Sequence, residues 1–162
     1  LAEFEETDLD QTYIDWLKDP EVVRYSNQRF HKHTYESREQ YRQTFDVAGK
    51  YFLSVSLIDS RQKIGTMTAY INTDHGTAHL GILIGEKTVW GCGYGIDAWR
   101  TLARWVEVEH GVRKITGGAL ARNKAMIRIF QKSKFHLEAV RRKQEIYCGV
   151  PEDILLYARF CK

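Results

Sequence analysis

The sequence predicts an α+β domain in which helices cover both faces of a mixed, mostly antiparallel sheet. The first observation is size, because 162 residues with 43% hydrophobic content can fill a core of ordinary size. The second is continuity, since no repeat, low-complexity tract or linker interrupts the chain and its only prolines are Pro20 and Pro151. The third is the hydrophobic pattern, which switches between the periods of helices and strands. We therefore expect residues 1–162 to form a single domain.

Two short helices are predicted ahead of most of the sheet. After an extended start, apolar residues share one face of a helix expected over residues 11–19, which Pro20 stops. Either Asp8 or Asp10 caps this helix. A polar loop follows, and the spacing of aromatic residues then indicates a second helix over residues 37–47.

Strands are expected where β-branched and aromatic residues alternate with polar ones. The expected strands span residues 50–60, 63–73, 77–85, 113–120, 136–147 and 153–161. Two further helices lie among them, one over 95–110 that ends at Gly111 and one over 123–134. The order is an antiparallel meander, two strand-to-helix units and a closing hairpin, which argues against a doubly wound parallel sheet.

Composition and charge exclude several function classes. A formal net charge of +3 lacks the basic excess of a general nucleic-acid binder. No apolar run approaches the ~20 residues that cross a bilayer, so no membrane partner is expected. The three irregularly spaced cysteines, Cys92, Cys148 and Cys161, predict no disulfide framework and fit reduced thiols in a cytoplasmic protein. His31 and His33 have no neighbouring cluster that completes a metal site, so no metal is expected.

A glycine-rich stretch carries the first functional signal. In "VWGCGYGIDAW", Gly91, Gly93 and Gly95 lie between a predicted strand and a predicted helix. Bare backbone and unpaired amides at a helix start suit a phosphate, but the same glycines also suit a plain tight turn. The spacing fits neither the P-loop nor the dinucleotide fingerprint. By itself, the loop leaves both interpretations open.

Two further segments make the pattern more specific. The loop resembles motif A of the GNAT superfamily of acetyl-CoA-dependent acyltransferases, with Trp90 where Gln or Arg is usual. "NKAMIRIFQKSKF" resembles NxxSxRxxEKxGF, and "WLKDPEVVRY" resembles WLxDPEV, both from the branch of ribosomal-protein N-terminal, amino-sugar and spermidine acetyltransferases. The likeness covers nearly the whole chain in order. It implies a GNAT fold, whose sheet is splayed between the fourth and fifth strands.

The resemblance also implies a binding site for acetyl-CoA as cosubstrate. The glycine-rich loop would hold the pyrophosphate, the strand before it would hold the pantetheine arm, and Asn123 would face that arm or simply cap its helix. Phe130 takes the register in which relatives have a tyrosine near the thiol. The cofactor-binding residues expected from this comparison are Ile82, Leu83, Ile84, Trp90, Gly91, Cys92, Gly93, Tyr94, Gly95, Asn123 and Phe130.

Proton transfer is less well defined by the comparison. Where many relatives have a glutamate as general base, this chain has His79 in "AHLGI", which is either a base or an exposed strand histidine. Some relatives use a tyrosine as the general acid, and Phe130 takes its place here. The leaving thiolate would then be protonated by Tyr147, by Ser133 or by water.

The acceptor is expected to be a primary amine on a small molecule or peptide. The loop "RYSNQRFHKHTYES" mixes cations and aromatics, and Arg29, His31 and His33 are the expected contacts for a nucleotide-linked amino sugar or an acidic protein N-terminus. A small polyamine or antibiotic is a third acceptor class, and the basic loop disfavours a polyamine. A noncatalytic acyl-CoA sensor is the alternative function, and a homodimer is left open.

Overall fold

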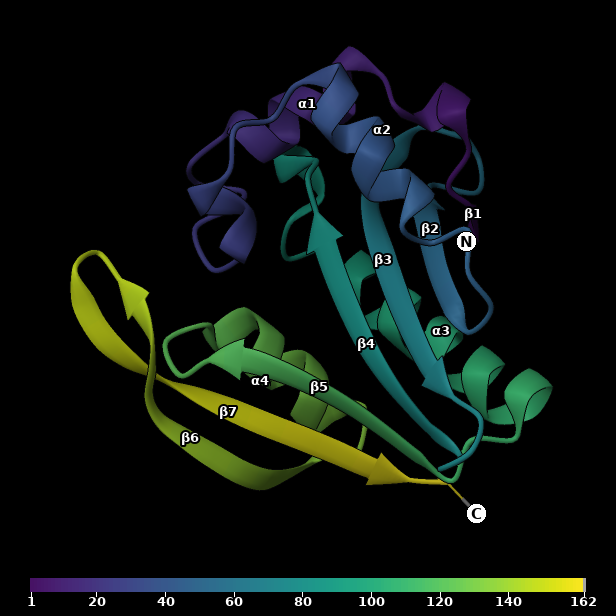
Figure 1. Ribbon diagram of the computed structural model, residues 1–162, viewed down its shortest axis with the longest axis vertical. Coiled ribbons are helices and arrows are strands. Elements are labelled where there is room, and N and C mark those ends of the chain that lie inside the picture. Colours follow the sequence, from purple (N-terminus) through teal and green to yellow (C-terminus); the bar gives the residue numbers. More distant parts are fainter. Residues whose placement is uncertain (162) are drawn as a thin grey trace.

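The computed structural model describes residues 1–161, which build a seven-stranded sheet flanked by helices (Figure 1). The strands are β1 (Ala2–Glu3), β2 (Lys50–Ser56), β3 (Lys63–Asn72), β4 (Thr77–Ile84), β5 (Lys114–Leu120), β6 (His136–Tyr147) and β7 (Val150–Phe160). The helices are α1 (Gln11–Lys18), α2 (Tyr35–Gln43), α3 (Tyr94–His110) and α4 (Lys124–Lys132), with short 3-10 turns η1 (Glu6–Asp8), η2 (Asn27–Phe30) and η3 (Lys87–Val89). The strand order is β1-β2-β3-β4-β5-β7-β6, and β4 and β5 form the one parallel pair among the described residues.

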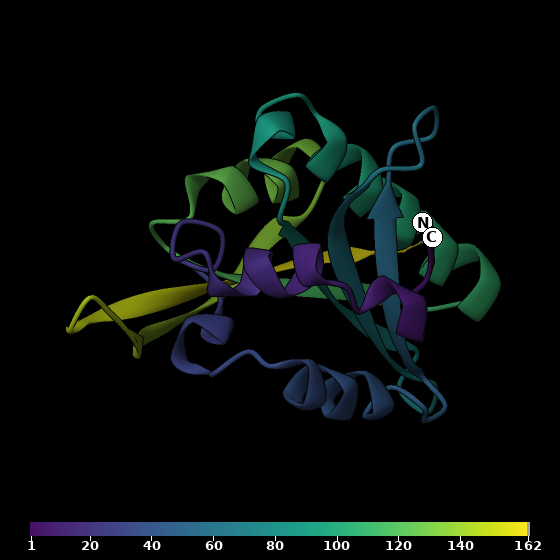
Figure 2. The same cartoon turned by 90° about the horizontal axis from the view of Figure 1, so that it is seen from above.

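The helices lie on both faces of the sheet, as predicted. Figure 2 shows α1 and α2 on one side of the strands and α3 and α4 on the other. Beneath α3 and α4 the fully buried residues include Trp99, Leu102 and Phe130. Beneath α1 and α2 a second cluster forms around Phe52. Burial of large apolar side chains on both faces supplies the main stabilising free energy of the fold.

The helix ends follow from local capping chemistry. Asp10, rather than Asp8, caps α1, because its carboxylate accepts a hydrogen bond from the amide of Tyr13 at 2.9 Å. The second helix differs from the expected range of 37–47. Thr34 and Ser37 form a reciprocal capping box, so α2 starts at Tyr35 and ends at Gln43.

The closing hairpin also extends further than its sequence predicts. β7 starts at Val150 instead of residue 153 and includes Pro151, because a tight two-residue turn lets pairing begin at once. Cys148 and Gly149 form that turn with φ of 49° and 78°, the backbone conformation of the favoured hairpin turns.

The splay between β4 and β5 positions the candidate site. β4 pairs with β3 along the whole length of β4, but it pairs with β5 only at residues 77–79. The two strands then diverge (Figure 1), so from residue 80 to 84 the outer edge of β4 pairs with no described strand. The predicted mixed, mostly antiparallel sheet with a splay between the fourth and fifth strands is therefore confirmed. No helix within residues 1–161 is long and apolar enough to cross a membrane.

Candidate active site

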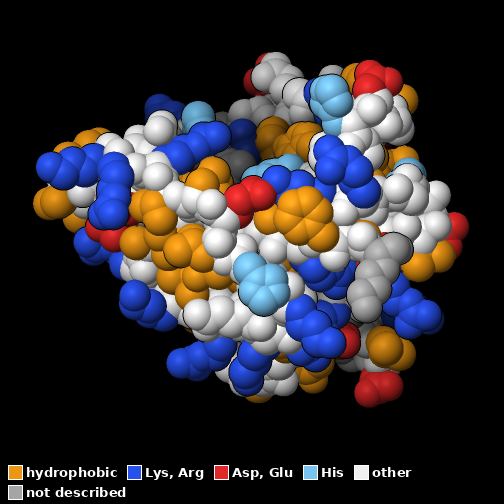
Figure 3. Space-filling view, turned by 90° about the horizontal axis from the view of Figure 1, so that it is seen from below, with side chains coloured by type: hydrophobic (Ala, Val, Ile, Leu, Met, Phe, Trp, Pro, Cys, Tyr) orange, Lys and Arg blue, Asp and Glu red, His pale blue; other side chains and the backbone are white. Residues whose placement is uncertain are grey.

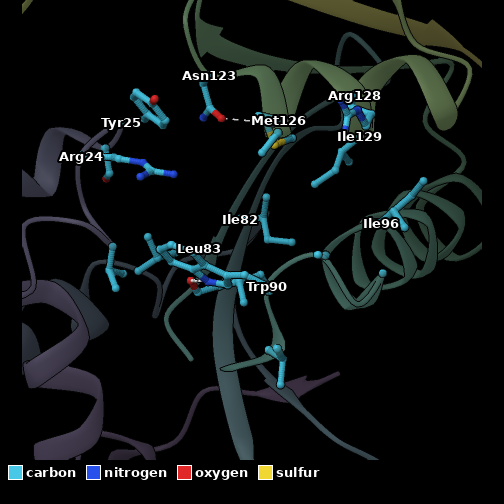
Figure 4. A pocket seen from close by; sticks show the side chains of 18 of the residues that line it. Arg24, Tyr25, Ile82, Leu83, Trp90, Ile96, Asn123, Met126, Arg128 and Ile129 are labelled. Atoms are coloured by element: carbon cyan, nitrogen blue, oxygen red, sulfur yellow. Dashed lines mark hydrogen bonds between the residues drawn. The ribbon is translucent and has the colours of Figure 1, made fainter. Parts of the chain in front are cut away.

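A pocket of about 440 Å³ lies in the splay. Its walls come from the end of β4, the glycine-rich loop, the start of α3, the outer face of α4 and the segment after α1 (Figure 4). The lining residues are Glu21, Val22, Arg24, Tyr25, Ser26, Ile82, Leu83, Ile84, Val89, Trp90, Gly91, Gly93, Gly95, Ile96, Asn123, Ala125, Met126, Arg128, Ile129 and Lys132. Segments that are far apart in the chain thus meet where the resemblance places the cofactor.

The glycine-rich loop combines a left-handed backbone with open space. Gly91 and Gly93 have φ of 81° and 96°, in the left-handed region that glycine adopts most readily. A side-chain carbon built on either glycine would meet no atom within 4 Å. The turn therefore requires glycine for its backbone, and the space beside it is free for a ligand.

The amides of this loop are available for an anion. Several backbone N–H groups of the loop donate no hydrogen bond to any acceptor within residues 1–161. They belong to Gly91, Gly93, Tyr94, Gly95 and Ile96. The last three are the first amides of α3, at the positive end of its helix dipole. A row of free amides at this end of a long helix is an anion-binding arrangement.

Trp90 has a structural role that its sequence position did not reveal. Its indole N–H donates a hydrogen bond of 2.9 Å to the carbonyl of Ile84, which fixes the ring as a pocket wall. The Arg24 guanidinium lies 5.6 Å from the centre of the same ring. Cys92 and Tyr94, which were also expected to contact the cofactor, are exposed and do not line the pocket.

α4 contributes a cap and two cations. The Asn123 carbonyl oxygen accepts a hydrogen bond from the amide of Met126 at 3.1 Å (Figure 4), so the residue caps α4 and lines the pocket at the same time. Arg128 and Lys132 follow at helical spacing and line the pocket. The matched helix motif contained both residues, but sequence reasoning assigned them no role.

The expected roles of two residues, one in α4 and one at its C-terminal end, are corrected by the structure. Phe130 does not line the pocket: it is 0% exposed and stacks on Tyr157, with ring centres 4.7 Å apart. Ser133 is also buried, and its hydroxyl has no partner within residues 1–161. Both face the core because α4 turns one apolar side toward the sheet, so neither is placed to contact a cofactor or a departing thiolate.

His79 lies at the closed end of the splay. It pairs with Thr116 in the last register position that β4 and β5 share, and its Nδ1 is 3.0 Å from the Thr116 hydroxyl. Desolvation by the surrounding chain, and then the positive charge of Arg141, lower the pKa of its imidazole. His79 is exposed and lines neither this pocket nor its neighbour.

A second pocket of about 720 Å³ adjoins the first. Its lining contains Arg29, His31, His33 and Tyr147, all expected at the acceptor or the proton-transfer site. The full lining is Leu17, Lys18, Pro20, Val23, Arg24, Gln28, Arg29, His31, Lys32, His33, Thr34, Tyr147 and Cys148. The structure therefore brings these residues together although more than a hundred positions separate the loop from Tyr147.

Contacts between the loop and the hairpin hold this second pocket in shape. Arg29 donates hydrogen bonds to the carbonyls of Ser26 and Ile146, at 2.7 and 2.9 Å. Tyr25, which lines the first pocket, lies against Tyr147 of the second with ring centres 5.7 Å apart. Arg24 lines both pockets. Sequence reasoning placed this segment at the acceptor and missed its contribution to the first pocket, because only the fold brings it to β4.

A protein-family model described as the acetyltransferase (GNAT) domain matches residues 1–136. The chain belongs to the GNAT family of acetyltransferases. Among solved structures, a GNAT-family acetyltransferase from Bacillus anthracis is 18% identical with a TM-score of 0.82, covering 98% of this chain and 92% of that one.

Two other GNAT structures were determined with ligands. The RimL ribosomal-protein alpha-N-acetyltransferase in complex with coenzyme A has a TM-score of 0.86 at 14% identity, covering 99% of this chain and 92% of that chain. The Vibrio cholerae spermidine N-acetyltransferase in complex with coenzyme A and spermine has a TM-score of 0.86 at 15% identity, covering 98% and 93%. At such identities the likeness shows the shared fold. A comparison with curated proteins gives no match.

Proposed function

We propose that this GNAT protein binds acetyl-CoA in the β4–β5 pocket and transfers the acetyl group to a primary amine that enters from the second pocket. The observation that carries the proposal is the row of unpartnered amides at the start of α3. These amides lie beside the pocket that Arg128 and Lys132 also line. Amides and cations arranged around one space fit a diphosphate. Acetyl-CoA supplies an acetyl group activated as a thioester.

The chain's own residues would do the binding and the polarisation. The free amides of Gly91 and of residues 93–96 would hold the pyrophosphate, and Arg128 and Lys132 would add charge beside it. The unpaired edge of β4 around Ile82 would hold the pantetheine arm as an added strand. A backbone amide of that edge would stabilise the negative charge that builds on the carbonyl oxygen during direct attack by the amine.

Proton transfer is proposed for two residues. His79 would accept the ammonium proton through water, because it lies at the closed end of the splay and its lowered pKa keeps the imidazole neutral near pH 7. Tyr147 would return a proton to the thiolate from the second pocket. Replacing His79 with alanine should lower kcat and leave acetyl-CoA affinity nearly unchanged, whereas an unchanged kcat would remove it from this role.

Calorimetry with acetyl-CoA tests the binding step. Arg128→Glu should weaken acetyl-CoA binding by about tenfold or more, since it replaces an attractive charge beside the phosphates with a repulsive one. Arg104→Glu is the matched control, because Arg104 is exposed on α3 and lines neither pocket. Failure of the unaltered protein to bind acetyl-CoA at millimolar concentration would contradict the proposal.

A thiol-release assay tests the transfer step. Amino sugars, their nucleotide-linked forms, peptides and polyamines would be offered in turn with acetyl-CoA, and free thiol would be measured. Thiol release that depends on an amine supports the transferase. Tight acetyl-CoA binding without release by any amine class would instead support the noncatalytic acyl-CoA-binding alternative.

A further inference from the structure

We infer that the second pocket binds a phosphate or diphosphate group carried by the acceptor amine, so that the acceptor class is a phosphorylated amine. This inference rests on the proposed function, because it names what the transferase acetylates. It follows from the charge of the pocket, from an unpartnered buried histidine in its wall and from the way the two pockets join.

The charge of the pocket is one-sided. Lys18, Arg24, Arg29 and Lys32 line it, and the lining contains no aspartate or glutamate. Arg29 and Arg24 each have one loose carboxylate neighbour outside the lining, at 3.8 Å. Lys18 and Lys32 form no ion pair with any described residue. Arg29 is already bonded to two backbone carbonyls, so Lys18, Lys32 and Arg24 are the cations of the lining that can meet the needs of a phosphate group.

His33 adds a polar group with unused hydrogen-bonding capacity. Its side chain is 6% exposed and lines the pocket. Nε2 lies 2.8 Å from the Gln28 carbonyl, which can only accept, so this nitrogen carries the proton. Nδ1 has no partner within residues 1–161. Burial, and then the positive charges of Arg38, His31 and Lys18, lower the pKa of His33. A neutral Nδ1 accepts a hydrogen bond from a ligand hydroxyl or a protonated phosphate oxygen, and it donates to a phosphate oxygen only after a bound anion has favoured its protonation.

The basic character continues beyond the pocket. Arg141, Arg142 and Lys143 on β6 lie in one run of the adjoining hairpin, whose acidic residues are Glu138, Glu145, Glu152 and Asp153. Figure 3 shows Lys and Arg side chains spread over the lower face of the molecule. This distribution of charge attracts anions and repels a polyamine. The pocket volume of about 720 Å³ lies in the range typical of small-molecule sites, which favours a phosphorylated small molecule over an acidic peptide.

The connection between the pockets orients such an acceptor. Arg24 lines both pockets, and Tyr25 and Tyr147 contact each other at their boundary. An acceptor whose phosphate lies among Lys18 and Lys32 would extend past this boundary toward Ile82 on the edge of β4. Its amine would then reach the site proposed for the thioester.

The first test uses pyrophosphate as the probe. The protein is saturated with coenzyme A, which fills the other anion site, and inorganic pyrophosphate is then titrated by calorimetry. We expect one equivalent to bind, and the Lys18→Glu/Lys32→Glu double variant to weaken this binding by about tenfold or more. Lys50→Glu is the control, since Lys50 is exposed at the start of β2 and lines neither pocket.

The outcomes separate this inference from the proposed function. Coenzyme A binding in the first titration reports on the β4–β5 pocket alone. The inference is wrong if coenzyme A binds and pyrophosphate does not. It is also wrong if pyrophosphate binds the double variant as tightly as the unaltered protein. In both cases the acetyl-CoA proposal stands. Lys32→Glu alone provides a second variant if Lys18→Glu disturbs the end of α1, because the one described side-chain contact to Lys32 is from Ser37 to its backbone carbonyl.

The second test compares acceptors that differ by a phosphate. Thiol release is measured for ethanolamine and phosphoethanolamine, for glucosamine and glucosamine 6-phosphate, and for an amino sugar with and without its nucleotide diphosphate. We expect kcat/KM to be at least about tenfold higher for the phosphorylated member of the pair that is used, and Lys32→Glu to reduce this ratio. Equal rates within every pair, or a higher rate for an acidic peptide, would overturn the inference.

Discussion

Replacing Gly93 with alanine separates the two meanings of the glycine-rich loop, a turn or a ligand cradle. Gly93 is the N-cap of α3 with φ of 96°, and the space where a side-chain carbon would lie is empty. The substitution therefore costs backbone strain without a clash, about 1 kcal/mol, because an L-residue is disfavoured in this region. If the space receives a phosphate, the new methyl group also obstructs the ligand.

The opposite end of the same helix provides a matched control. Gly111 is the C-cap of α3, has φ of 60° and likewise has no atom within 4 Å of a built side-chain carbon. Gly93→Ala and Gly111→Ala should each lower the unfolding temperature by about 2–4 °C, as expected for a loss near 1 kcal/mol in a domain of this size. Only Gly93→Ala should also weaken acetyl-CoA binding, by about tenfold, equivalent to about 1.4 kcal/mol.

The assay is thermal unfolding of both variants followed by calorimetry with acetyl-CoA. Equal acetyl-CoA affinities for Gly93→Ala and Gly111→Ala would refute the reasoning, because the loop would then need glycine only for its turn. A loss of affinity in both variants would also refute it, since general destabilisation would explain the result.

Three further predictions concern stability. Gly85→Ala should destabilise the fold by about 1–3 kcal/mol in urea unfolding, because its methyl group would lie 2.0 Å from the Trp16 ring; an unchanged midpoint would mean that α1 can shift. Asn123→Ala should lower the free energy of unfolding by about 1 kcal/mol through loss of the α4 cap, whereas Asn123→Asp should keep the cap and most of that stability. Because the folded pKa of His33 is lowered, its contribution to stability is complete above about pH 6.5 and is lost as the pH falls toward the folded pKa. His33→Gln should flatten the decline in urea stability between about pH 7.5 and 5.5, and an identical slope would show that other groups cause it.

Sequence reasoning reached the fold and the glycine-rich turn because both depend on local pattern. The alternation of strands and helices follows from hydrophobic periodicity, and the need for glycine at Gly91 and Gly93 follows from the backbone of a strand-to-helix turn. Helix ends were less accurate, since the capping pair of Thr34 and Ser37 lies outside the apolar pattern.

The direction of individual side chains was harder to predict. Phe130 and Arg128 lie two positions apart on α4, yet one is fully buried and the other lines the pocket. Helical geometry separates such neighbours by more than half a turn, and only the contact with the sheet determines which one is buried. The indole of Trp90 likewise binds the Ile84 carbonyl because β4 has already separated from β5.

The sequence by itself determined the family, the order of the elements and the glycine loop, all of which rest on residues close together in the chain. Only the tertiary structure decided which distant residues share a pocket. It joined Arg24 and Tyr25 to the pocket at the β4–β5 splay, placed Tyr147 and His33 in the lining of the second pocket and left His79 at the closed end of the splay. These placements depend on strand register and on the packing of remote segments, for which no short stretch of sequence carries a signal.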